Sequence, residues 1–256
     1  MANKNLGQHW LNDQTILQSM IKAAGVGPED EVLEIGPGQG SLTLLLLKHG
    51  AKVIAVELDS ELVGKLQAEL ADNPQLELVQ GDILDFDLRQ MGPKYKVIAN
   101  IPYYLTGKLL RKLLEATSPP SSIVLLVQKE VAERITARPG QMSILAVVAQ
   151  YYSDVSLGLV VKAELFSPAP KVDSQVVILQ PKRTARSEDS KLFRLVKIGF
   201  SARRKKLANN LSAGLVFDKV EAKTALQTCG LDELIRAQEL GVEDWLCLEE
   251  SLNGES

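Results

Sequence analysis

Short apolar runs recur along the first half of the chain, with segments of helical periodicity between them. The runs occupy residues 31–35, 52–56, 76–80, 96–100 and 122–128, and the helical segments occupy 41–49, 60–71 and 106–116. Continuous rather than alternating apolar runs are typical of strands covered by helices on both faces. Strands that alternate with helices predict βαβ units and a mainly parallel sheet. We therefore expect an open α/β domain whose ligand binds beyond the carboxyl ends of the strands.

The pattern changes after the fifth apolar run. A helical segment near 142–150 is followed by two longer extended stretches, 154–166 and 174–180, with no helix between them. Parallel neighbours need a crossover connection, whereas antiparallel strands do not. We therefore expect the two stretches to form an antiparallel pair that closes one edge of the sheet.

The last part of the chain lacks strand patterns. Residues 181–190 are polar without apolar periodicity and are interpreted as a linker, and 191–256 has helical patterns only. The sequence therefore predicts two domains, an α/β domain over 1–185 and a small helical domain over 186–256.

Composition narrows the class of protein. The chain is 45% hydrophobic and 24% charged, which is typical of a soluble globular protein. No stretch approaches the roughly 18–20 apolar residues of a membrane span, and the N-terminal residues lack the apolar core of a signal peptide. The two cysteines, Cys229 and Cys247, are too few for a disulfide framework or a zinc site. We expect a cytoplasmic protein without a metal and without a membrane.

The net charge of −3 conceals an uneven distribution. Ten Lys or Arg residues and two acids lie between Lys182 and Lys206, whereas eight acids and one basic residue lie between Cys229 and Ser256. Such asymmetry suggests a local basic surface offset by an acidic tail. Two solvated helix faces of opposite charge would give the same pattern, so charge alone does not decide the function.

A glycine-rich turn follows the first strand. The sequence there is E-I-G-P-G-Q-G, with glycine at Gly36, Gly38 and Gly40, and a helix begins directly afterwards. Glycine allows close approach of a ligand to the backbone, and the helix N-terminus offers free N–H donors. The dinucleotide pattern G-x-G-x-x-G would need a glycine at position 41, which is Ser41. The spacing favours an adenosyl amino acid over a pyrophosphate.

Two carboxylates follow the next two strands. Glu57 ends the second strand, where a carboxylate can accept hydrogen bonds from both ribose hydroxyls. Asp82 follows the third strand and is a candidate acceptor for the adenine amino group of the cofactor. The alternative interpretations are an exposed loop acid for Glu57 and a turn or N-cap aspartate for Asp82.

The fourth strand ends in N-I-P-Y, residues 100–103. An exocyclic amine of a base is a poor nucleophile because its lone pair is delocalised, so an enzyme must hold it with the lone pair directed at the methyl donor. The side-chain oxygen of Asn100 and the carbonyl of Ile101 can accept its two N–H groups, and Pro102 keeps Ile101 extended. Tyr103 can stack on a flipped base. The alternative is a polar strand end followed by a turn.

In these and further blocks the sequence resembles the KsgA family of small-subunit ribosomal RNA adenine N6,N6-dimethyltransferases. The blocks span residues 7–211 in the order of the family: G-Q-H-W-L-N-D (7–13), E-I-G-P-G-Q-G (34–40), V-E-L-D (56–59), G-D (81–82), N-I-P-Y-Y (100–104), Q-K-E-V-A-E-R (128–134), F-S-P-A-P-K-V-D-S (166–174) and F-S-A-R-R-K-K-L-A-N-N-L (200–211). The resemblance implies a Rossmann-like methyltransferase sheet and S-adenosyl-L-methionine as the cofactor.

The resemblance also assigns residues that chemistry alone does not. His9 and Leu11 would bind the cofactor together with Gly36, Glu57, Asp82 and Asn100, and Phe166 would hold the target adenine opposite Tyr103. The basic residues of the helical domain would bind RNA, namely Arg203, Arg204, Lys205 and Lys206. From the residues alone, His9 is a polar tail residue and Phe166 a core residue, and a solvated helix face is the alternative interpretation of the basic run. Trp10 stands where the family usually has phenylalanine.

The resemblance implies dimethylation of two adjacent adenines in a hairpin near the 3′ end of the small-subunit RNA, with a role in ribosome assembly. The expected partner is the small ribosomal subunit, and we expect a monomer. Two alternatives stay open. One is a large-subunit adenine dimethylase that confers macrolide resistance, and the other is a non-catalytic assembly factor. Intact Asn100, Glu57 and glycines favour an active enzyme.

Overall fold

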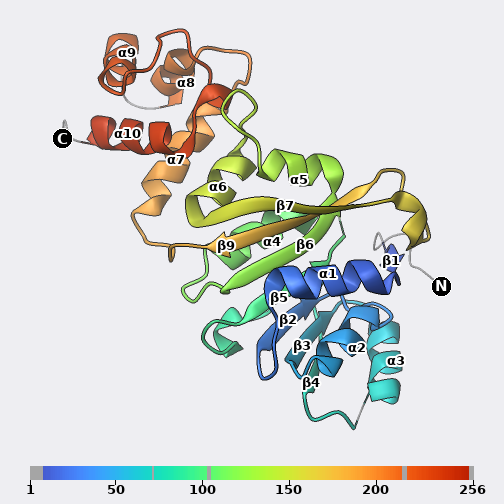
Figure 1. The fold of residues 1–256 in the computed structure, drawn as a ribbon. Helices are drawn as coiled ribbons and strands as arrows, with labels where there is room; N and C mark the ends of the chain where they lie inside the picture. Colours follow the sequence, from blue (N-terminus) through green and yellow to red (C-terminus); the bar gives the residue numbers. More distant parts are fainter. Residues whose placement is uncertain (1–7, 71, 103–104, 215–217, 254–256) are drawn as a thin grey trace. The chain divides into compact units, whose positions relative to one another are not determined.

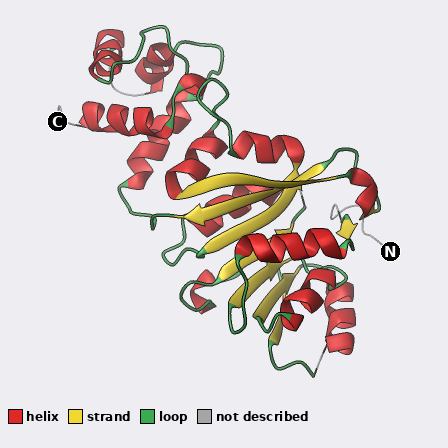
Figure 2. Cartoon of the chain, in the orientation of Figure 1, coloured by secondary structure: helices red, strands yellow, loops and turns green. Residues whose placement is uncertain are grey.

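The computed structural model describes residues 8–70, 72–102, 105–214 and 218–253. Contacts divide the chain into two compact units: Met1–Glu133 with Tyr152–Thr184, and Arg134–Tyr151 with Ala185–Ser256. The first unit alternates strands and helices, and the second is helical (Figure 2). The segment 134–151 precedes the edge strands in sequence and yet belongs with the helical unit.

A seven-stranded sheet forms the centre of the first unit, in the order β4-β3-β2-β5-β6-β9-β7 (Figure 1). The strands are β2 (Glu31–Ile35), β3 (Lys52–Glu57), β4 (Leu76–Gln80), β5 (Lys96–Asn100), β6 (Ser122–Gln128), β7 (Ser153–Val161) and β9 (Ser174–Pro181). The first five are parallel, and β9 pairs antiparallel with both β6 and β7. The predicted fold class is confirmed, including the antiparallel pair at the edge.

Helices precede, connect and follow the parallel strands of the first unit. They are α1 (Gln14–Ala24), α2 (Ser41–Lys48), α3 (Ser60–Leu70), α4 (Thr106–Leu114) and α5 (Lys129–Ile135), the last of which ends in the second unit. Helix α1 is absent from the elements predicted above, although its local signals are clear. Asp13 caps its first turn by accepting from the Ile16 N–H at 3.1 Å. Gly25 ends it at a φ of 63°, which glycine adopts without strain.

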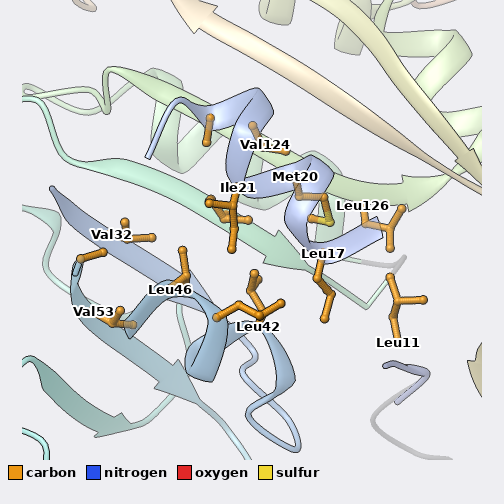
Figure 3. Packing of buried hydrophobic residues seen from close by; sticks show 14 of the residues in the cluster. Leu11, Leu17, Met20, Ile21, Val32, Leu42, Leu46, Val53, Val124 and Leu126 are labelled. Carbon is orange, nitrogen blue, oxygen red and sulfur yellow. The ribbon is translucent and has the colours of Figure 1, made fainter. Parts of the chain in front are cut away.

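Helix α1 covers one face of the sheet. Leu17, Met20 and Ile21 of α1 belong to one buried cluster with Val124 and Leu126 of β6 and with Leu42 and Leu46 of the helix after β2 (Figure 3). The three α1 residues are at most 2% exposed, and burial of each such side chain stabilises the fold by roughly 1.5–3 kcal/mol. This packing fixes the segment just before α1, which matters for the site below.

The second unit contains α6 (Ile144–Tyr152), α7 (Asp189–Gly199), α8 (Leu207–Gly214), α9 (Lys219–Thr228) and α10 (Val242–Asn253). Trp245 of α10 is fully buried and lies against Gly199, where a Cβ atom would collide with the indole ring. Glycine is therefore required at the end of α7.

The two cysteines pair with each other. Cys229 at the end of α9 and Cys247 of α10 form a disulfide, with their Cα atoms 5.8 Å apart. Two cysteines cannot make a framework of several bridges, but the packing of two helices brings this pair within bonding distance. The expected cytoplasmic location stays a prediction. No described helix is long and apolar enough to span a membrane.

Candidate functional site

A cleft lies at the carboxyl ends of β2, β3 and β5. Its lining comes from the opening segment 8–12, the glycine turn after β2, the end of β3 and the end of β5. Because neighbouring parallel strands end at the same edge of a sheet, residues far apart in sequence meet here. The cleft is the place at which the sequence predicted a ligand.

The glycine turn leaves one wall of the cleft free of side chains. Gly36, Gly38 and Gly40 have φ values of 67°, 59° and 80°, in the left-handed region that favours glycine. A Cβ atom on Gly36 would meet no atom within 4 Å, whereas one on Gly38 would lie 3.2 Å from the Trp10 ring. Gly36 thus faces open space, and Trp10 packs directly on Gly38.

Glu57 is held in place at the end of β3. Its Oε2 accepts from the Gly38 N–H at 3.1 Å, and its Oε1 accepts from the Asp59 N–H at 2.9 Å. The side chain is 7% exposed. A carboxylate oxygen has two lone pairs, so each oxygen retains one for a ligand. The arrangement suits acceptance from two adjacent hydroxyls, and the ribose role stays a prediction.

Glu34 is a second carboxyl group in the cleft, and the sequence patterns assigned it no role. It is 1% exposed, lines the cleft, and its Oε2 has no hydrogen-bond partner among the described residues. Burial raises the pKa of Glu34 to about 8; hydrogen bonding with Thr43 opposes this effect, and the negative charge of Glu57 adds to it. The acidic position before the glycine turn was the signal that could have found it.

Asn100 has a defined amide orientation. Its Nδ2 donates to the His9 carbonyl at 2.9 Å. Because a carbonyl only accepts, the NH2 end of the amide must face His9, and Oδ1 then points away from it. The described residues place no donor on Oδ1. The oxygen is therefore available as an acceptor, as the predicted amine-holding role requires.

The opening segment is fixed by a short ladder. Strand β1 (Trp10–Leu11) pairs antiparallel with β8 (Phe166–Ser167), and the His9 Nδ1 lies 2.7 Å from the Pro168 carbonyl. His9 and Leu11 both line the cleft, where the resemblance implied cofactor contacts. Sequence patterns cannot show this pairing because its strands have two residues each.

The remaining predicted residues lie in different places. Ile101 lines the cleft. Phe166 is 5% exposed and packs in the core beside Leu11 rather than lining the cleft. Asp82 is exposed, and its Oδ1 accepts from the Leu84 N–H at 2.8 Å, as a turn aspartate does. Tyr103 lies outside the described residues. The cofactor role of Asp82 and the base-holding roles of Phe166 and Tyr103 stay predictions.

The basic run belongs to the helical unit. Arg203, Arg204, Lys205 and Lys206 are all exposed and lie in the turn between α7 and α8 rather than on a helix face. No described ion pair involves them. The buried Asn210 fixes the turn by donating to the carbonyls of Gly199 at 2.6 Å and Ala202 at 3.1 Å. Four cations without a described ion-pair partner are thus held on a defined backbone.

Comparison with known proteins points to one family. The family described as ribosomal RNA adenine dimethylase matches residues 1–254. A protein of Thermosynechococcus vestitus named ribosomal RNA small subunit methyltransferase A is 44% identical, covering 98% of this chain and 97% of the relative. A protein of the same name from Dehalococcoides mccartyi (strain CBDB1) is 41% identical, covering 97% of this chain and 88% of the relative.

Two solved structures share the fold over nearly the whole chain. A dimethyladenosine transferase from Plasmodium falciparum matches with a TM-score of 0.83 and 29% identity, covering 96% of this chain and 98% of its own. The 23S rRNA methyltransferase ErmE matches with a TM-score of 0.77 and 25% identity, covering 95% of this chain and 99% of its own. The similarity extends through the helical unit as well as the sheet.

Proposed function

Because the chain belongs to the ribosomal RNA adenine dimethylase family, we propose that it transfers methyl groups from S-adenosylmethionine to adenine N6 of small-subunit ribosomal RNA. The two curated relatives reported above carry the small-subunit name and are more than 40% identical. The 23S rRNA methyltransferase has the same fold at lower identity. We assign small-subunit RNA as the substrate because the similarity to the small-subunit enzymes is higher than that to the 23S rRNA methyltransferase.

The cleft fits a cationic adenosyl ligand. Two carboxyl groups, Glu34 and Glu57, lie in it, and its described lining contains neither Lys nor Arg. The Glu57 carboxylate would repel a pyrophosphate and attract a sulfonium or an ammonium group. The open space beside Gly36 leaves room for backbone contact, and Leu11 and Leu62 provide apolar surface.

S-adenosylmethionine, when bound, supplies an electrophilic methyl group on a positively charged sulfur. Glu57 would hold its ribose hydroxyls, and Glu34 would lie near its positive charge. His9, Leu11, Gly36, Gly38, Asp82 and Asn100 would complete the binding site. No metal is needed for this chemistry, because the methyl group is already activated.

Asn100 is the residue on which the proposed mechanism of methyl transfer depends. Its Oδ1, on which no described residue places a donor, and the Ile101 carbonyl would accept the two N–H groups of the target amine, so the amine lone pair is directed out of the base plane. The nitrogen becomes acidic only as it is methylated, and its proton can then pass to water without a strong base. The same contacts can hold a monomethylated amine through one N–H, which permits a second transfer. Two adjacent dimethyladenines near the 3′ end are the expected product.

The partner is expected to be the assembled or assembling small subunit, with a monomeric enzyme. Adenine N6 can be methylated only after the base leaves its stack, and RNA-binding proteins recognise such unstacked bases within a particular shape. The helical unit, with its basic turn 203–206, would supply phosphate contacts. A non-catalytic assembly factor is disfavoured because the cleft retains Glu57, Asn100 and the glycines.

The test is transfer of tritiated methyl groups to purified small and large ribosomal subunits, followed by nucleoside analysis. We expect label in dimethyladenosine of immature small subunits and little label in large subunits or in an isolated hairpin. An Asn100→Ala variant serves as the inactive control. Label mainly in large-subunit RNA would overturn the assignment in favour of a resistance-type methylase.

A further inference from the structure

Helix α7 has a solvent-exposed face on which every charged residue is a cation. Lys191, Arg194 and Lys197 are exposed, and Ser190 is the other exposed residue of the helix. Residues three apart lie on the same side of a helix, so the three cations form one ridge about 9 Å long at ~1.5 Å per residue. The opposite side is buried through Leu192, Phe193, Leu195 and Val196.

This arrangement works against helix stability. Like charges at i and i+3 destabilise a helix by a few tenths of a kcal/mol per pair, and α7 has two such pairs, Lys191 with Arg194 and Arg194 with Lys197. Lys197 lies in the last turn, where the helix dipole favours a cation, but Lys191 lies in the first turn, where it does not. The folding of α7 therefore does not account for the three cations on its exposed face.

No described ion pair neutralises the cations of the ridge. Asp189 is buried and accepts from the Tyr151 hydroxyl at 2.7 Å and from the Arg186 N–H at 2.9 Å. Lys223 and Glu233 form an ion pair in the same unit, whereas none of the described ion pairs involves the three cations of α7. The ridge thus presents three cations to solvent, and the nearest exposed acid in sequence is Glu188, three positions before Lys191.

The helix that carries the ridge is firmly held. Phe193 packs edge-to-face on Tyr151, with ring centroids 5.4 Å apart, and Gly199 packs against Trp245. Asn210 ties the end of α7 to the start of the basic turn through the carbonyls of Gly199 and Ala202. The ridge and the turn 203–206 therefore belong to one ordered segment.

We propose that Lys191, Arg194 and Lys197 form a phosphate-binding ridge that extends the RNA contact of the basic turn along α7. The inference rests on the proposed function in taking RNA as the polyanion. A protein interface would need an apolar centre, and membrane binding by a surface helix needs an apolar face; the exposed face of α7 has neither. At an axial spacing of ~3.4 Å per phosphate on one strand, the ridge spans on the order of three phosphates.

The test is binding of the triple variant K191Q/R194Q/K197Q to small ribosomal subunits, measured without S-adenosylmethionine between 50 and 200 mM salt (roughly the range in which phosphate contacts respond most). Loss of three phosphate contacts should weaken binding about tenfold or more at low salt and flatten the log–log salt dependence by about 2–3. Because no methyl transfer is measured, an inactive enzyme would leave this result interpretable.

Two further variants make the test specific. K22Q/K48Q/K219Q removes three exposed cations elsewhere and should change the slope little. K191R/R194K/K197R keeps the charge and should restore the wild-type slope. Circular dichroism of each variant checks that α7 remains folded. An unchanged slope in the glutamine variant, or an equal change in the scattered control, would overturn the proposal. Loss of binding to poly-glutamate with RNA binding intact would assign the ridge to an acidic protein instead and would equally overturn it.

Discussion

Replacing Glu34 with glutamine should stabilise the protein at neutral pH and remove much of the pH dependence of its stability. The carboxyl group is 1% exposed, and its Oε2 has no described partner. Burial raises the pKa of Glu34 to about 8, and the nearby charge of Glu57 also raises it. The folded protein therefore holds a proton on Glu34 that the unfolded chain has released.

The size and sign of the stability change follow from the linkage between proton binding and folding. The folded pKa lies above the unfolded value of 4.5, so the stabilisation is complete below pH 4.5, is lost as pH rises, and is gone above about pH 8. Each tenfold change in the ionisation constant is worth about 1.4 kcal/mol. The folding stability lost between the two pKa values is therefore about 5 kcal/mol in total, of which about 3 kcal/mol is lost by pH 7. An amide in the same place avoids this loss but leaves an unmet hydrogen bond of about 1–2 kcal/mol. A net gain of about 1–2 kcal/mol at pH 7 is expected for Glu34→Gln.

Urea unfolding of wild type and Glu34→Gln from pH 5 to pH 9 measures this directly. The two stability curves should diverge as pH rises and should become parallel above pH 8. Glu77→Gln, at an exposed glutamate of β4, is the matched control and should follow the wild type. Parallel curves for wild type and Glu34→Gln over the whole range would refute the reasoning, because Glu34 would then ionise equally in both states.

The same residue links pH to the cofactor. A bound cation favours the ionised carboxylate, so binding of S-adenosylmethionine should release a proton from Glu34. Affinity should then increase from pH 6 to pH 8 in the wild type and vary less in Glu34→Gln. Calorimetry in two buffers of different ionisation enthalpy detects the released proton, and equal heats in both buffers would contradict the linkage.

Three further predictions test Glu57, Asn100 and the basic turn 203–206. Glu57→Ala should weaken S-adenosylmethionine binding by roughly 1.5–3 kcal/mol, because charge-assisted contacts to the ribose are lost; calorimetry that gave wild-type affinity would exclude Glu57 from the site. Asn100→Ala should lower methyl transfer by about 10²–10³ at saturating cofactor, as when one preorganised polar contact is removed; near-normal turnover would exclude the amine-holding role. Glutamine at all four positions of the basic turn 203–206 should flatten the salt dependence of RNA binding without changing cofactor affinity, and an unchanged slope would make the turn a solvated surface.

The sequence alone determined the α/β architecture and the main positions of the cleft. Apolar runs report which segments are buried on both faces, and this local property located β2 to β6 and the edge pair. Glycine at three alternate positions and a carboxylate at the end of β3 are also local features, so the residue pattern suffices to place Gly36 and Glu57 in the cleft. Helix α1 was missed although its cap residues and apolar spacing are equally local.

Tertiary structure decided what depends on contacts between distant segments. The His9 carbonyl that orients the Asn100 amide lies 91 positions away in sequence, and the two-residue strand that fixes His9 pairs with Phe166–Ser167. No periodicity reports such short pairings. The raised pKa of Glu34 and the Cys229–Cys247 bond likewise arise because packing removes a carboxyl from water and brings two helices together. Sequence patterns specify which residues are buried, but hydrogen bonds and charge environments depend on what each buried group then meets.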